Sequence, residues 1–259
     1  MPVARERDLP GVILFDMDDT IFDHSLTCRA AIARLRREHG FLRRRPLAEL
    51  WNEYQRLLGL THPDVALGRR APDDARAERW QKVALRCGTT LTLTEARHLS
   101  QEYRGFYQSL RRPIAGAPRL LERLHRRTRI GVVSNNEVAE QEEKIRYLGI
   151  GRWIDLLVVS GEVGVTKPDP VIFRTALERA DVEPADAVMV GDSWENDVLG
   201  ALGAGIRPVW FNRFRLPRPD PTPVAELESL RSFPAVERAL RSPTTGRVRP
   251  GPPRSARAL

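Results

Sequence analysis

The sequence predicts an α/β fold with a doubly wound, parallel-sheet (Rossmann-like) core and an α-helical domain inserted into it. Short, nearly continuous apolar runs recur along the chain and alternate with helical patterns, which is typical of parallel strands buried on both faces. The stretch from Ile21 to Arg112 is different, because it has helical periodicity and no convincing strand. It is too long for an ordinary connection between two core strands, and this favours an inserted helical cap.

The core strands are expected where four or more apolar residues follow one another. Such runs suit burial in a parallel sheet, whereas strict alternation of apolar and polar residues would indicate a sheet with one solvent-exposed face. Four runs are clear and a fifth is a candidate. They lie at residues 11–15, 130–133, 156–159 and 187–190, with the candidate at 208–211.

The helices are expected between these strands and throughout the inserted stretch. Pro170 follows Asp169, the N-cap and first-turn pattern of a helix, and Gly149 is placed to end another. Turn signals such as His62-Pro63-Asp64 separate the helices of the insert. The core helices are predicted at 117–127, 138–148, 170–180 and 196–202, and those of the insert at 27–38, 47–58, 75–85 and 94–110.

These elements divide the chain into three parts. Residues 1–20 and 113–241 are expected to form the α/β core, and residues 21–112 the helical cap. Residues 242–259 are rich in Pro, Gly, Ser, Thr and Arg and have too few apolar side chains for a core, so a disordered basic tail is expected there.

Composition narrows the classes of function. The chain has 259 residues and a net charge of +8, but bases alternate with acids in stretches such as Glu137 to Arg146, so a solvated surface is favoured over a nucleic-acid-binding one. Cys28 and Cys87 give no disulfide framework, and no apolar run is long enough to span a membrane. A cytoplasmic protein with no membrane partner is expected.

Polar residues directly follow three of the predicted strands. Asp16 follows the first, Ser134 and Asn135 follow the second, and Asp192 follows the fourth. In parallel α/β sheets the ligand site lies outside the carboxyl ends of the strands. We therefore expect these residues to meet at one edge of the sheet.

The residue types at this edge favour phosphoryl chemistry. Asp16, Asp18, Asp192 and Asp197 would repel one another unless a cation or base lay between them. Mg²⁺ prefers oxygen ligands and is often shared with a substrate phosphate, and Lys167 is the obvious basic neighbour. A carboxylate such as Asp16 can accept a phosphoryl group, and a second one such as Asp18 can move the proton.

The same residues carry a resemblance to the haloacid dehalogenase superfamily, specifically to its phosphatase-type members with a helical cap inserted after the first motif. The family's four motifs occur in order and together cover the chain from about Val12 to Asn212. They are met by Asp16, Asp18 and Thr20, by Ser134, by Lys167, and by Asp192 with Asp197 downstream.

The resemblance implies hydrolysis of a small phosphate monoester through an aspartyl-phosphate intermediate. Asp16 would be the nucleophile and a metal ligand, and Asp18 the general acid and base, with its backbone carbonyl on Mg²⁺. The dehalogenase branch lacks an acid at the position of Asp18, so this residue favours phosphate esters over carbon–halogen bonds.

The remaining motif residues are expected to hold the phosphate and the metal. By the same resemblance, Ser134, Asn135 and Lys167 bind the phosphoryl oxygens. Asp192 is a direct ligand of Mg²⁺, and Asp197 binds the ion either directly or, as the favoured alternative, through a metal-bound water. Nucleoside monophosphates, sugar phosphates and other small phosphorylated metabolites all fit this pattern, which assigns no oligomeric state.

Other residues have plainer interpretations. Asp19 and Thr20 are expected to support the loop after the first strand, and all five histidines to be surface or packing residues. A phosphomutase or a 2-haloacid dehalogenase could use the same Asp16. The alternative from a different class of protein is a non-catalytic module, in which the hydrolase core is inactive and the basic tail binds partners.

Overall fold

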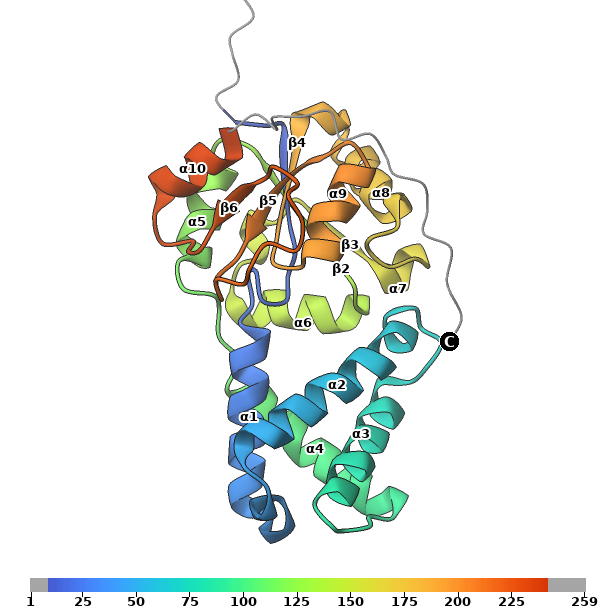
Figure 1. The fold of residues 1–259 in the computed structure, drawn as a ribbon. Helices are drawn as coiled ribbons and strands as arrows, with labels where there is room; N and C mark the ends of the chain where they lie inside the picture. The colour runs from blue at the N-terminus through green and yellow to red at the C-terminus, as the bar shows by residue number, and fades with distance from the viewer. Residues whose placement is uncertain (1–8, 242–259) are drawn as a thin grey trace, which may run out of the picture.

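The computed structural model describes residues 9–241 and contains a parallel sheet with helices on both faces (Figure 1). The sheet confirms the predicted α/β class. Its six strands are all parallel and are ordered β3-β2-β1-β4-β5-β6. They are β1 Val12–Phe15, β2 Arg129–Ser134, β3 Leu156–Val159, β4 Ala187–Gly191, β5 Arg207–Phe211 and β6 Ala225–Leu227.

The centre of the sheet sets the position of the site. Strand β1 lies between β2 and β4, and Phe15 is level with Val132 on one side and Val190 on the other. The backbone N–H of Asp16 continues this pairing by donating to the carbonyl of Val190, at 2.9 Å. Because the three strands are parallel and end close to the same level, the residues at their carboxyl ends are brought to one edge.

Helices cover both faces of the sheet and bury its apolar runs. Leu121 of α5 and Leu240 of α10 belong to the core on one face, and Phe173 of α8 and Ala201 of α9 to the core on the other. The core helices are α5 Ala117–His125, α6 Val138–Leu148, α7 Ser160–Val163, α8 Pro170–Ala180, α9 Gly200–Gly203 and α10 Phe233–Arg241.

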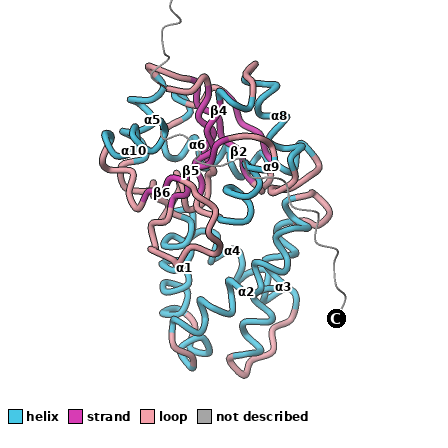
Figure 2. The backbone as a smooth tube through the Cα atoms, turned by 45° about the horizontal axis from the view of Figure 1, so that its top comes forward, coloured by secondary structure: helices cyan, strands magenta, loops and turns pink. Residues whose placement is uncertain are grey.

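Four further helices, here called the cap helices, follow β1 in the chain and lie beyond the end of the sheet, as Figures 1 and 2 both show. Tyr54, Trp80 and Tyr103 pack at their centre, with ring centroids 5.2 Å apart. Thr92 and Glu95 form a reciprocal N-terminal cap on the last of them. They are α1 His24–Glu38, α2 Leu47–Ala66, α3 Pro72–Arg86 and α4 Leu93–Ser109.

The predicted end of α2 at Gly59 is wrong. The helix runs on through Gly59 and Pro63 to Ala66, so the expected turn at His62-Pro63-Asp64 is helical. A proline inside a helix removes one hydrogen bond, and tertiary contacts offset this loss. Val65 and Ala66 are buried, and the hydroxyl of Ser160 donates to the carbonyl of Ala66 at 2.7 Å.

Three other elements differ from expectation. Residues 194–199 form a π-helical turn where an α-helix was expected, and π-turns are common at functional sites. Strand β6 and helix α10 have only short apolar patterns, and the sequence did not single them out.

The other expectations from the sequence concern the cysteines, membrane-spanning segments and the C-terminal tail. Cys28 and Cys87 are buried and free. No helix within residues 9–241 combines the length and apolar character needed to cross a membrane. The predicted disordered tail, residues 242–259, lies outside the described residues.

Candidate active site

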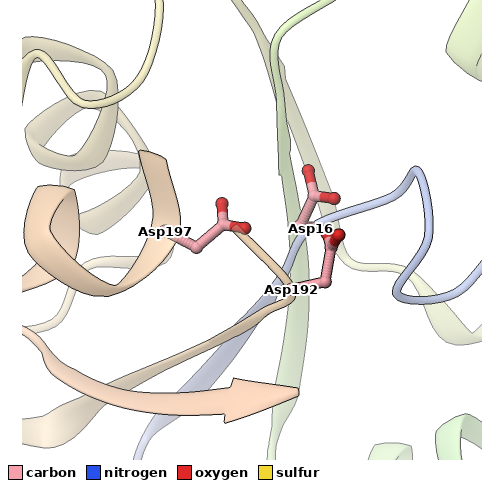
Figure 3. A group of neighbouring side chains, drawn as sticks. All are labelled: Asp16, Asp192 and Asp197. Atoms are coloured by element: carbon pink, nitrogen blue, oxygen red, sulfur yellow. The ribbon is translucent and has the colours of Figure 1, made fainter. Parts of the chain in front are cut away.

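Three carboxylates converge at the carboxyl edge of the sheet. Asp16 follows β1, Asp192 follows β4, and Asp197 lies in the π-helical turn (Figure 3). One oxygen from each lies within 4.8 Å of the others. Oxygen ligands grouped in this way, from three separate segments, are the kind of donor set that Mg²⁺ takes. The side chains present therefore fit a hard divalent cation.

Lys167 supplies the positive charge beside these carboxylates. Its Nζ donates to Asp16 Oδ1 and to Asp197 Oδ1, each at 2.6 Å, and to the carbonyl of Val133 at 2.9 Å. Burial alone would lower the pKa of Lys167, but the charges of Asp16 and Asp197 outweigh it and raise the pKa above its ordinary value. The ammonium is thus held charged and fixed in direction.

One lysine does not balance the three carboxylates. Burial, followed by repulsion from Asp197, raises the pKa of Asp16 to about 7, although Lys167 acts against this. Burial and the charges of Asp16 and Asp197 also raise the pKa of Asp192 well above its ordinary value. The arrangement therefore has an excess of negative charge that a divalent cation would neutralise.

Asp18 is also near the edge, but its carboxylate has different partners. Lys144 Nζ lies 2.7 and 2.9 Å from its two oxygens, and Gln141 Nε2 donates to it at 3.1 Å. Burial would raise the pKa of Asp18, but the charge of Lys144, and then that of His24, holds it well below its ordinary value. The structure therefore holds Asp18 as a carboxylate.

Lys144 and Gln141 were missed by the sequence analysis. Lys144 lies within the stretch Glu137 to Arg146 that was interpreted as a solvated surface, yet it is 1% exposed and Gln141 is fully buried. The two residues are three apart on α6, so both face the site. The available signal for these two residues was their spacing on a helix that closely follows the strand ending at Ser134.

Ser134 is the last residue of β2 and Asn135 follows it, so both lie at the expected end of the strand. The Ser134 hydroxyl accepts from Gln141 Nε2 at 2.8 Å, so Gln141 links Ser134 to Asp18. The Asn135 carboxamide makes two bonds to the backbone of Lys167, accepting from its N–H at 2.7 Å and donating to its carbonyl at 3.0 Å. In this arrangement Asn135 fixes the loop that carries Lys167.

Asp19 and Thr20 support the loop, as expected. Asp19 has a left-handed backbone, with φ of 62°, and its carboxylate accepts from the N–H and hydroxyl of Ser25 and from Arg213. The Thr20 hydroxyl donates to Asp192 Oδ1 at 3.4 Å. These bonds hold the chain between Asp16 and α1.

His24 and His62, which were expected to be surface or packing residues, have a position that the sequence did not predict. Both line the cavity that contains Asp16 and Lys167. His24 Nδ1 lies 2.9 Å from the Tyr107 hydroxyl, and His62 Nε2 lies 2.8 Å from the carbonyl of Asn135. They come from α1 and α2, so the cap helices form one wall of the cavity.

Gly191 is required for the position of Asp197. A Cβ at Gly191 would lie 2.3 Å from Cγ of Asp197, whereas a Cβ at Gly203 meets nothing within 4 Å. We expect Gly191→Ala to displace Asp197 and to weaken Mg²⁺ affinity about tenfold or more, in line with the effect of disturbing residues that orient a metal site. Titration of Mg²⁺ by calorimetry checks this.

Gly203→Ala is the matched control, and its Mg²⁺ affinity is expected to equal that of the wild type. Unchanged affinity in Gly191→Ala would contradict the proposed place of Asp197 in the metal site.

Comparison with known families agrees with the motifs. The family model for haloacid dehalogenase-like hydrolases matches residues 10–205. A pyrimidine 5′-nucleotidase, YjjG of Escherichia coli, is 38% identical over 109 residues, which are 42% of this chain and 48% of that protein. The chain spans about half the length or less of the first curated relatives that it matches.

A longer match and a solved structure extend the comparison. Glyceraldehyde 3-phosphate phosphatase of Pyrococcus abyssi is 29% identical over 210 residues, covering 77% of this chain and 80% of that protein. The structure of the hydrolase YfnB from Bacillus subtilis, bound to magnesium, superposes with a TM-score of 0.70 at 23% identity. It covers 86% of this chain and 96% of that chain and supports the fold.

Proposed function

Because the chain belongs to the haloacid dehalogenase-like hydrolase family, we propose that it is a Mg²⁺-dependent phosphatase of small phosphorylated metabolites. The observation that carries the proposal is the group of Asp16, Asp192 and Asp197 around Lys167 at the carboxyl edge of the sheet. Relatives named for the hydrolysis of phosphate esters support the same class.

The acidic group is proposed to hold Mg²⁺. Asp16 and Asp192 would bind the ion directly, the backbone carbonyl of Asp18 would be a further ligand, and Asp197 would hold a metal-bound water. Bound there, the ion would neutralise the carboxylates and the charge of a substrate phosphate. The structure of a magnesium-bound protein of the same fold supports this choice of ion.

Asp16 is proposed to attack phosphorus and to carry the phosphoryl group as an aspartyl phosphate. Its carboxylate is oriented by Lys167, which lies 2.6 Å away. Lys167 and the hydroxyl of Ser134 would bind the phosphoryl oxygens, and Asn135 would contribute by fixing the loop of Lys167. Positioning and charge stabilisation supply most of the catalysis in such transfers.

Asp18 is proposed to protonate the leaving oxygen and then to deprotonate the attacking water. The carboxylate form that Lys144 stabilises is the form needed for the second step. For the first step Asp18 must carry a proton, so its pairing with Lys144 has to weaken when the substrate binds. This coupling makes Lys144 a positioning residue for Asp18.

The cap helices are proposed to form a domain of residues 21–112 on a core of residues 1–20 and 113–241. His24 and His62 bring this domain against the cavity of Asp16. A cap in that place can exclude water and choose the leaving group.

Release of phosphate tests the proposed function. With p-nitrophenyl phosphate and with simple alkyl phosphates, hydrolysis is expected in Mg²⁺ and its loss in EDTA, with recovery when Mg²⁺ is returned. Activity that survives EDTA would contradict the metal site. Halide release from 2-haloacids, or isomerisation of a sugar phosphate without free phosphate, would favour a dehalogenase or a phosphomutase instead.

A further inference from the structure

Arg79 is a buried cation in the cap helices that has no acidic partner among residues 9–241. It lies on α3 and is 5% exposed. No carboxylate of those residues approaches its guanidinium within the 4.0 Å of an ion pair. Its Nη1 donates to the hydroxyl of Thr61 at 2.8 Å, and its buried Nε has no partner.

Such a group is costly for the cap to hold by itself. A buried charge ordinarily has a counter-charge, and a buried donor ordinarily has an acceptor. The ring of Tyr54 lies below the guanidinium, 5.5 Å from ring centroid to Cζ, and offsets only part of the charge. An anion contacting the guanidinium of Arg79 would supply the missing counter-charge.

Other arginines nearby show what a compensated site looks like. Arg76, one turn earlier on α3, pairs with Asp73 at 2.8 Å and with Glu140 at 3.6 Å. Arg111 pairs with Glu143 at 2.9 Å and with Glu140 at 3.6 Å. All three residues are arginines, but Arg79, unlike Arg76 and Arg111, has no acidic partner among residues 9–241.

Arg79 lines a cavity that adjoins the one around Asp16. The cavity lies between the cap helices and the loop after β2, and it is also lined by Tyr54 and Tyr107. His24 and His62 line both this cavity and that of Asp16. A molecule held by its phosphate at Asp16 could therefore extend past the two histidines towards Arg79.

We propose that Arg79 binds a second anionic group, a carboxylate or a phosphate, at the far end of the phosphate ester. A guanidinium offers paired donors that match the paired oxygens of either group. The inference rests on the proposed function and narrows it to phosphate esters whose leaving group is itself an anion.

The direct test is a matched series of alkyl phosphates with spacers of increasing length. At each length the far end is a hydroxyl, a carboxylate or a second phosphate, and kcat/KM is measured with Mg²⁺. At the spacer that fits, the wild type is expected to prefer a charged end over the hydroxyl by about tenfold or more, chiefly in KM. The carboxylate and bisphosphate arms identify which anion is used.

Arg79→Met and Arg76→Met then locate the preference. Arg79→Met is expected to lose it while still hydrolysing the hydroxyl-ended ester, and Arg76→Met is expected to keep it. Because Arg79→Met removes a buried, unpaired charge, its unfolding temperature without ligand is expected to equal or exceed that of the wild type. A structural role for Arg79 predicts a lower one.

Two outcomes would overturn the inference. If the wild type shows no preference for a charged end at any spacer length, the inference is wrong whatever the variants show. A preference that persists in Arg79→Met, or in the uncharged variant Arg79→Gln if the first variant unfolds, would place the anion elsewhere. Turnover of the hydroxyl-ended ester reports separately on the proposed phosphatase function. A failure of that function can therefore be distinguished from a failure of the proposed anion site at Arg79.

Discussion

Asp16→Asn is expected to lower kcat for every phosphate ester by about 10⁴-fold or more, the scale on which removing a covalent nucleophile acts. The amide keeps the shape of the side chain but cannot attack phosphorus. It also takes one carboxylate from the group that would bind Mg²⁺, so metal affinity is expected to fall as well. Steady-state release of phosphate at saturating Mg²⁺ measures the loss of turnover.

The stability of the same variant separates chemistry from misfolding. Burial, followed by the charge of Asp197, raises the pKa of Asp16 to about 7 against the opposing effect of Lys167, so the folded chain disfavours the charged form relative to the unfolded chain. This destabilising effect grows as the pH rises from the ordinary range of an aspartate to about 7. Without Mg²⁺, Asp16→Asn should therefore be at least as stable as the wild type at neutral pH.

Glu195→Gln is the matched control. Glu195 is exposed and lies in the π-helical turn that carries Asp197, so this change removes a nearby carboxylate outside the proposed metal site. Its activity is expected to equal that of the wild type. An Asp16→Asn protein that folds, binds Mg²⁺ and still turns over at the wild-type rate would exclude Asp16 as the nucleophile.

The loss of activity in Asp18→Asn is expected to depend on the leaving group of the substrate. Alkyl phosphates need a proton on the leaving oxygen, and their hydrolysis should fall by about 10²- to 10⁴-fold, the usual contribution of a general acid and base. p-Nitrophenolate leaves without a proton, so the first step with its phosphate ester should survive. Because the second step also needs a base, the variant should give a burst of p-nitrophenolate followed by slow turnover.

Lys144→Met is the comparison variant, because it keeps the Asp18 carboxylate and removes its ion pair. Lys144 lowers the pKa of Asp18, so its loss should raise that pKa and move the dependent limb of the pH–rate profile to higher pH. No burst in Asp18→Asn, together with equal losses for alkyl and p-nitrophenyl esters, would contradict the acid–base assignment.

The sequence predicted the residues at the strand ends better than it predicted their partners. Asp16 and Asp192 follow buried apolar runs, and runs of that kind align in a parallel sheet, so their meeting at one edge follows from local patterns. Lys144 faces the site from a helix whose charges alternate along the sequence, and its burial depends on how α6 lies against Asp18. The three-residue spacing of Gln141 and Lys144 marks a shared helix face, but it does not say that this face is buried.

The cap illustrates the same limit. Gly59 and Pro63 are ordinary helix-ending signals, and they were overridden because residues beyond them are buried against the core. Arg79 has the sequence context of an exposed helix residue, with Glu78 before it. Its burial without an acid depends on contacts between α2 and α3, which separate parts of the chain supply.

Trapping the phosphorylated enzyme tests the central claim most directly. Wild-type protein is mixed with Mg²⁺ and a phosphate ester, quenched during turnover and treated with borohydride, which reduces an acyl phosphate to an alcohol. Peptide mass mapping is expected to find Asp16 converted to homoserine, with no conversion when the ester is omitted. Turnover that leaves Asp16 unmodified, or reduction at a different carboxylate, would contradict the aspartyl-phosphate mechanism.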